Sequence, residues 1–246
     1  MFMLFKKQPE AVQCLHNHAS TFTGESHLTL KYAIRGLLVV GALCGASANA
    51  VTITYDSTLD AQGIPTTTVA GATVVNFSAG CTGYASCFGN GAIVQGSLPG
   101  RYAAPGLLSD TNPYLSVPLD LSQTTLSATL LLPTTANYFG LFWGSIDDYN
   151  TLSFLLNGST VASFTGLDIT SPANGNQSAP ATNTYVNFFD LPTFNGVVIS
   201  STQYAFESDN HAYASVPEPA TLALLSAGLL GMGVGRRRRK VTSMPA

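Results

Sequence analysis

Positive charge is almost missing from the central part of this chain. Between residues 51 and 217 the only cation is Arg101, against ten aspartates and glutamates, so this segment has a net charge of −9 whereas the whole chain has −3. A surface without lysine has no means of neutralising phosphates, which disfavours nucleic-acid binding and docking to anionic membranes. Cations and neutral sugars remain as ligand classes.

Groups that transfer protons are also scarce. The segment 51–217 contains one histidine, His211, and none of the motifs Gly-x-Ser-x-Gly, His-Glu-x-x-His or a glycine-rich phosphate loop with its lysine. Because acid–base catalysis needs groups of matched pKa, the sequence predicts a protein that is not an enzyme. A secreted glycoside hydrolase is the less favoured alternative, with Asp147 or Asp148 paired with Glu207 as its two carboxyls.

No segment of the chain shows a sustained apolar i, i+3, i+4 stripe. Short runs of β-branched and aromatic residues recur instead between Gly, Asn, Pro and Asp clusters. The pattern predicts an all-β domain over 51–215, a two-sheet antiparallel, jelly-roll-like sandwich, with a closed barrel as the alternative. Long surface loops are expected over 98–113 and 171–180. The expected strands are 51–56, 72–78, 91–96, 124–132, 136–144, 149–156, 160–165, 184–189, 197–200, 204–207 and 212–214.

The clearest local signal is the dipeptide Asn157-Gly158 between two apolar runs. Both residues tolerate the left-handed backbone of a type I′ turn, so the flanking segments should form a hairpin. The expected register pairs Leu156 with Ser159 and Phe154 with Val161, which places the larger apolar side chains on one face of the sheet.

A targeting segment precedes the predicted domain. Lys31 and Arg35 lead into an apolar stretch over 36–46, which ends in the small-x-small sequence Ala48-Asn49-Ala50. This order predicts a signal-peptide helix over 31–50 that is cleaved after Ala50. Residues 1–30 do not fit a signal peptide and form an upstream extension, which a misassigned start of translation would explain.

Export places the domain in an oxidising compartment. Only Cys81 and Cys87 of the four cysteines then remain in the mature protein. We expect them to form a structural disulfide that closes a short loop and contributes roughly 2 kcal/mol. A redox Cys-x-x-Cys motif or a four-ligand zinc site needs a spacing or ligands that this segment lacks.

The C-terminal region combines three elements in a fixed order. A Pro-Glu-Pro sequence comes first, an apolar run over 222–234 follows, and a cluster of five cations comes last. The apolar run is short for a hydrocarbon core of ~30 Å, and the cations should stop transfer and stay in the cytoplasm. The residues concerned are Val216, Pro217, Glu218 and Pro219 in the first element and Arg236, Arg237, Arg238, Arg239 and Lys240 in the last.

These residues resemble the PEP-CTERM sorting signal of exported proteins of Gram-negative bacteria, which the membrane transpeptidase exosortase processes. The resemblance implies a sorting signal over 216–240 with a short transmembrane helix, followed by a tail over 241–246. It also implies an inner-membrane precursor that later reaches the cell surface, the outer envelope or the extracellular matrix. Segments 138–150, 185–188 and 205–210 resemble an uncharacterised β-sandwich domain of PEP-CTERM surface proteins.

Together these patterns predict an exosortase-processed surface or matrix protein, associated with exopolysaccharide or biofilm, with a structural or adhesive role. The alternative is a lectin-like carbohydrate-binding module. Trp143 with Tyr149 is the candidate platform for stacking on a sugar, which would make extracellular polysaccharide a partner. No cofactor is required, although Ca²⁺ could bind carboxylates. The candidate calcium ligands are Asp147 and Asp148 with Asn150, or Glu207 and Asp209 with Asn210.

Overall fold

The computed structural model describes residues 50–106 and 111–217. The chain divides into two compact units, Met1–Ala48 and Asn49–Ala246, of which the first lies outside the described residues. The predicted signal helix with Ala48, the predicted membrane helix, Glu218, Pro219 and the cluster over 236–240 lie outside them as well. In the described ranges, no helix is long and apolar enough to cross a membrane.

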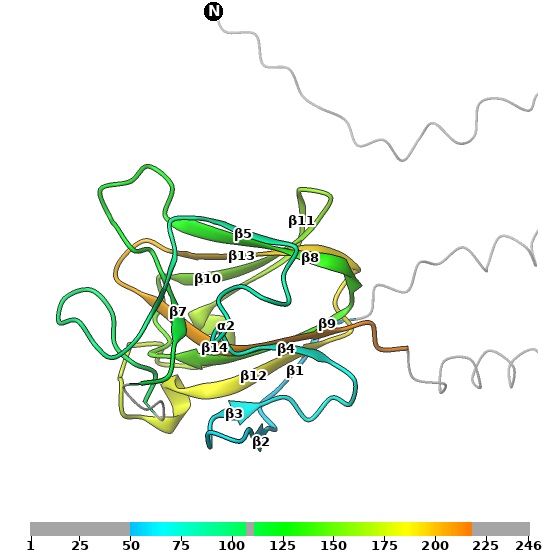
Figure 1. Ribbon diagram of the computed structural model, residues 1–246, viewed down its shortest axis with the longest axis horizontal. Helices are drawn as coiled ribbons and strands as arrows, with labels where there is room; N and C mark the ends of the chain where they lie inside the picture. Colours follow the sequence, from blue (N-terminus) through cyan, green and yellow to red (C-terminus); the bar gives the residue numbers. More distant parts are fainter. Residues whose placement is uncertain (1–49, 107–110, 218–246) are drawn as a thin grey trace, which may run out of the picture. The chain divides into compact units, whose positions relative to one another are not determined.

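The described domain is built almost entirely of antiparallel strands, as the sequence predicts (Figure 1). A seven-stranded sheet has the order β1 (Thr52–Thr54), β12 (Thr184–Phe189), β9 (Tyr138–Gly144), β14 (Phe206–Ala214), β7 (Tyr114–Val117) and β6 (Ala92–Val94), and β4 (Thr73–Val75) also pairs with β14. A five-stranded sheet has the order β11 (Ser159–Thr165), β10 (Asn150–Leu156), β13 (Phe194–Ser201), β8 (Ser127–Ala136) and β5 (Ser86–Gly89). The remaining elements are the hairpin β2 (Thr58–Leu59) and β3 (Pro65–Thr66), a short helix α2 (Gly166–Ile169) and a 3₁₀ turn η2 (Pro180–Thr182).

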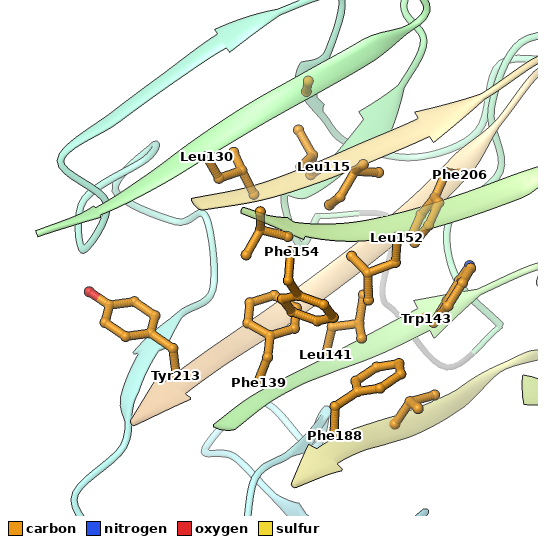
Figure 2. Packing of buried hydrophobic residues seen from close by; sticks show 14 of the residues in the cluster. Leu115, Leu130, Phe139, Leu141, Trp143, Leu152, Phe154, Phe188, Phe206 and Tyr213 are labelled. Atoms are coloured by element: carbon orange, nitrogen blue, oxygen red, sulfur yellow. The ribbon is translucent and has the colours of Figure 1, made fainter. Parts of the chain in front are cut away.

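Aromatic side chains from both sheets form one core. Phe154 of β10 lies edge-on to Phe139 of β9, with ring centroids 5.5 Å apart, and to Phe188 of β12 at 5.7 Å. Figure 2 shows these rings with Leu141 and Leu130 in the space between the sheets. Because successive strand residues point to opposite faces, β9 supplies every second side chain, Phe139, Leu141 and Trp143, to this core.

The seven-stranded sheet is also covered on its other face. Every residue of β9 is buried, including Tyr138 and Phe142, which alternate with the core residues. Ile64, between β2 and β3, packs with Phe142 and Tyr185. Asn210 of β14 donates a hydrogen bond from Nδ2 to Asp60 of the same hairpin. The β2–β3 hairpin therefore lies on the face opposite the five-stranded sheet (Figure 1).

The hairpin predicted at residues 157–158 is present, with one correction. Asn157 and Gly158 both have positive φ, at 51° and 84°, as a type I′ turn requires. Leu156 pairs with Ser159 as expected, but Phe154 pairs with Ala162 and not with Val161, because the register shifts between residues 154 and 155. The shift is a bulge, which the turn dipeptide does not encode.

Two other strand predictions need correction. The predicted strands 204–207 and 212–214 are replaced by a single strand, β14, which begins at Phe206 and whose register to β9 shifts between Asp209 and Ala212. The short strands β2, β3, β5 and β7 were not predicted. The expected disulfide joins Cys81 to Cys87, and β5 begins inside the loop that it closes. The jelly-roll-like order remains a prediction.

Candidate functional site

Two buried carboxyls lie side by side on the outer face of β14. Glu207 and Asp209 are 2% and 3% exposed. Phe206 and Ser208 alternate with them and belong to the inner face, since Ser208 is the register partner of the core residue Trp143. Glu207 has Gly144 of β9 on one side and Ser116 of β7 on the other. The strand order therefore places the two acids beneath the loops that cover this face.

A surface pocket of about 440 Å³ opens above Glu207. Three segments that are distant in the sequence line the pocket. They are the loop with Ser97 and residues 99–103, the single residue Gln177, and the start of β14, where Glu207 lines the pocket together with residues 204–205 just before the strand. Pro105 holds this loop against the sheet at Gly144, where an added Cβ would approach the Pro105 Cβ to 2.6 Å. Glycine at position 144 thus allows the loop to lie close to the sheet.

The carboxyl group of Glu207 is only half satisfied. Oε1 accepts a hydrogen bond from the Ala103 N–H at 3.0 Å, whereas Oε2 is buried without a hydrogen-bond partner. Burial raises the pKa of Glu207 to about 8, and the charge of Asp147 raises it further, while the Ala103 N–H works in the opposite direction. The raised pKa favours the protonated carboxyl at neutral pH, and in that form an O–H at Oε2 has no acceptor within the described domain.

The single cation of the domain lies at the rim of the same pocket. The Arg101 guanidinium is 5.5 Å from the centre of the Tyr204 ring, and its Nη1 donates to the Leu119 carbonyl at 3.0 Å. Tyr149 donates to the Tyr204 carbonyl at 3.1 Å, so this predicted residue supports the pocket wall from behind. The pocket thus combines one cation, tyrosine rings and one neutral acid.

Trp143 does not lie where a sugar could reach it. Its side chain is 0% exposed, and its ring stacks on Phe206 with centroids 4.2 Å apart. The prediction that Trp143 provides a sugar-stacking face is wrong, because the alternation of β9 turns this residue toward the core together with Phe139 and Leu141.

Neither of the two predicted calcium sites, Asp147 with Asp148 or Glu207 with Asp209, has the arrangement expected of a metal site. Asp148 is exposed while Asp147 is buried, and the Asn150 Oδ1 accepts the Asp147 N–H at 2.9 Å. Glu207 and Asp209 are neighbours on β14, but burial raises the pKa of both carboxyls to about 8. In the part of the chain that the structure describes, no three His, Cys, Asp or Glu side chains come together as a metal site.

The histidine of the domain is a core residue. His211 is fully buried, with Nδ1 2.8 Å from the Tyr84 hydroxyl and Nε2 2.9 Å from the Ser208 hydroxyl. Its ring lies edge-on to Phe77 and Phe139. Burial lowers the pKa of His211 to about 3, so the ring stays neutral and holds the two hydroxyls in place.

The end of the domain is attached to the segment that follows it. After β14 ends at Ala214, one side chain binds both backbone groups of Val216: Asn137 Oδ1 accepts the Val216 N–H at 2.6 Å, and Asn137 Nδ2 donates to the Val216 carbonyl at 2.7 Å. A hollow of about 330 Å³ beside this contact is lined by residues 69–71 and 213–217, among others. The first residues of the predicted sorting signal are therefore part of the folded domain.

Sequence reasoning located parts of this site but not its assembly. Glu207 and Tyr149 were singled out, and both are at or beside the pocket. Gln177 and Tyr204 were missed, because nothing local marks a residue that a loop brings to a pocket. The isolated positive charge of Arg101 was the one signal that could have directed attention to this loop.

Comparison with known protein families gives one match, to the PEP-CTERM protein-sorting motif over residues 215–240. No curated protein and no solved structure matches the chain. The match confirms the resemblance identified in the C-terminal sequence and begins immediately after β14. The chain is therefore an exported protein that carries a PEP-CTERM motif, through which exosortase sorts it to the cell surface.

Proposed function

We propose that this protein is a non-enzymatic structural or adhesive component of the surface or extracellular matrix of a Gram-negative bacterium. A helix after residue 217 holds the precursor in the inner membrane until exosortase processes it. The matrix is one of exopolysaccharide, and the two sheets form a jelly-roll-like sandwich within it.

The observation that carries this proposal is the direct junction between domain and motif. β14 ends at Ala214, the motif match begins at residue 215, and Asn137 binds Val216. A residue before proline is biased toward an extended backbone, so a Pro-Glu-Pro sequence suits a peptide that a transpeptidase must reach. The folded domain then lies close to the periplasmic surface of the inner membrane, which holds the precursor.

The chemistry of the domain is consistent with a non-enzymatic role. His211 is buried in the core and neutral, so it has no contact with a substrate. Arg101 is the only cation in the segment 51–217, which leaves hydroxyl and amide groups to interact with a hydrated matrix. Such groups exchange hydrogen bonds with neutral polysaccharide as readily as with water.

Fractionation of cells tests the sorting route. We expect deletion of residues 216–240 to release the folded domain as a soluble periplasmic protein, since the membrane segment is gone. Glu218→Ala should leave an unprocessed precursor in the inner membrane. Asp148→Asn, at an exposed position outside the motif, is the matched control and should be sorted like wild type. Immunoblots of each fraction report both mass and abundance. Wild-type mass and abundance at the surface for both motif variants would contradict the proposal.

The non-enzymatic role is tested with the purified full-length chain and the exopolysaccharide of the producing strain. We expect the polysaccharide to keep its size distribution after prolonged incubation, as measured by size-exclusion chromatography. Release of shorter fragments by the wild type, but not by Glu207→Gln, would make the protein a glycoside hydrolase that uses this carboxyl.

A further inference from the structure

The pocket beside Glu207 contains a donor that the folded domain leaves unused. Glu207 is 2% exposed, lines the pocket, and has one oxygen, Oε2, without a partner. Leaving a buried polar group unpaired costs about 1–3 kcal/mol, so such a group is uncommon unless something else binds it. The cost is removed when the carboxyl turns so that Oε2 reaches the pocket and a ligand there supplies a hydrogen-bond partner for it.

The lining of the pocket indicates the kind of ligand. Tyr102 and Tyr204 give apolar ring surface, while Gln177 gives an amide that both donates and accepts hydrogen bonds. The volume of about 440 Å³ falls within the range of small-molecule sites. A ligand with an apolar body and several hydroxyl groups could pack against the tyrosine rings and form hydrogen bonds with both the amide and the carboxyl.

The charges around the pocket favour a neutral ligand over a divalent cation or an anion. A divalent cation would lie beside the positive charge of Arg101, and no group of three acidic, His or Cys side chains in the described ranges would hold it. An anion would be attracted by Arg101 alone, against a segment of net charge −9. A neutral ligand meets neither difficulty.

We propose that the pocket formed by Glu207, Arg101, Tyr102, Tyr204 and Gln177 binds a neutral sugar unit of an extracellular polysaccharide. Glu207 donates from Oε2 to an oxygen of the sugar while Oε1 remains bound to Ala103. Gln177 and Arg101 bind further hydroxyls at the rim. This proposal rests on the proposed function in one respect, since the domain must lie outside the cell to meet the polysaccharide. Sugar binding at the pocket would be the contact through which the protein adheres.

The test uses the full-length chain, purified in a detergent whose head group contains no sugar. Binding of neutral gluco-, galacto- and manno-oligosaccharides is measured by saturation-transfer NMR and titration, beside an alginate fragment as the acidic arm and CaCl₂ as the cation arm. Glu207→Gln keeps a donor at the position of Oε2 and an acceptor for the Ala103 N–H, whereas Glu207→Met removes both with little change in volume. Asp209→Asn is the matched control, because Asp209 is an equally buried acid on β14 that does not line the pocket.

We expect a neutral oligosaccharide to bind wild type, Glu207→Gln and Asp209→Asn with similar affinity, and Glu207→Met about tenfold more weakly, as for the loss of one hydrogen bond. A ligand that covers the pocket excludes water from Glu207, which disfavours the charged carboxylate. The affinity of the wild type should therefore fall as pH rises through about 8, whereas that of Glu207→Gln should not change. This pH profile separates a contact with ligand from a merely structural role, even where Glu207→Met does not fold.

Four results would overturn the proposal. Three concern the wild type: binding of the alginate fragment alone, binding of calcium alone, or no binding of any neutral sugar. The fourth is equal affinity of Glu207→Met and wild type for the neutral sugar. None of these results affects sorting, which the fractionation experiment tests separately. Failure of the pocket and failure of the proposed function are thus distinguishable.

Discussion

Both faces of the seven-stranded sheet are buried, but within the described residues only the outer face carries buried acids. The inner face carries Phe139, Leu141 and Phe206, packed against the five-stranded sheet. The outer face carries Glu207 and Asp209 beneath loops and the β2–β3 hairpin. The inner face stabilises the fold by excluding water from apolar surface. The outer face keeps acids in their neutral form, so its contribution depends on pH.

The largest expected effect of a single substitution is in the core, where Phe154 of β10 packs against the inner face of the seven-stranded sheet. Phe154→Ala removes a fully buried ring that contacts Phe139, Phe188 and Phe194. We expect a loss of about 3–5 kcal/mol in the free energy of unfolding, measured by denaturant titration, because a cavity remains. Leu167→Ala, at an exposed position of α2, is the control and should change stability little. Similar losses for the two variants would contradict this account of the core.

The largest pH-dependent effect is expected on the outer face. The pKa of Glu207 and of Asp209 is raised to about 8 in the folded state, so the folded protein holds protons that the unfolded chain releases near pH 4. The stability from these groups is present below about pH 4 and is lost as pH rises to 8, by up to about 1.4 kcal/mol per pH unit for each acid. The double variant Glu207→Gln, Asp209→Asn should lose this slope in melting curves recorded between pH 5 and 8.

His211 gives the opposite dependence from the inner face. Its pKa is lowered to about 3, so its contribution is present above about pH 6.5 and is lost as pH falls toward 3. The acid side of the stability profile should therefore remain in the double variant of the outer face. A profile of the double variant that matches the wild type at every pH would refute the assignment of neutral acids to β14.

A moderate effect is expected where the loop over 97–106 meets the outer face. In Gly144→Ala the new Cβ would lie 2.6 Å from the Pro105 Cβ, so the loop must move away from β9. We expect a loss of about 1–3 kcal/mol, as for other overpacked sites, and weaker sugar binding at the pocket. Gly100→Ala, in the same loop with open space around the added Cβ, controls for a general effect of alanine, although its positive φ adds some strain. Unchanged stability and binding in Gly144→Ala would mean that Pro105 does not fix the loop.

The smallest effect concerns the junction with the sorting motif. Asn137→Ala removes the two hydrogen bonds to Val216 and should cost about 1 kcal/mol, since part of that backbone can bind water instead. Hydrogen exchange at the Val216 amide should accelerate, while exchange in the core of β9 stays slow. Asn137→Asp keeps the acceptor and should exchange more slowly than Asn137→Ala. Equal exchange rates at Val216 in all three proteins would show that Asn137 does not hold it.

The sequence correctly predicted features that depend on residues close together in the chain. The positive φ of Asn157 and Gly158 and the pairing of Cys81 with Cys87 both follow from residues close in sequence. The run Ser208–His211 was taken for a break between strands because it is polar. It is instead buried within β14, where loops and a hairpin from distant segments cover the sheet.

The candidate site could be predicted only in part for the same reason. Glu207 and Asp147 were selected as candidate functional carboxyls, but their burial and hydrogen-bond partners depend on which segments fold over them. The pocket needs residues near 100, near 177 and at 204–207, and no periodicity relates these segments. Trp143 was predicted to stack on a sugar but is buried in the core. Alternation along a strand shows which residues share a face, but it does not show which face is the core.

The central claim is that the C-terminal motif sorts a folded β domain to the cell surface, and the mass of the surface form tests it most directly. The protein is released from intact cells, purified with an antibody against the domain and analysed by mass spectrometry of the whole protein and its peptides. We predict a disulfide-bonded domain that lacks the segment 222–240, while the inner-membrane precursor retains it. A surface form that retains residues 222–240 would contradict the account.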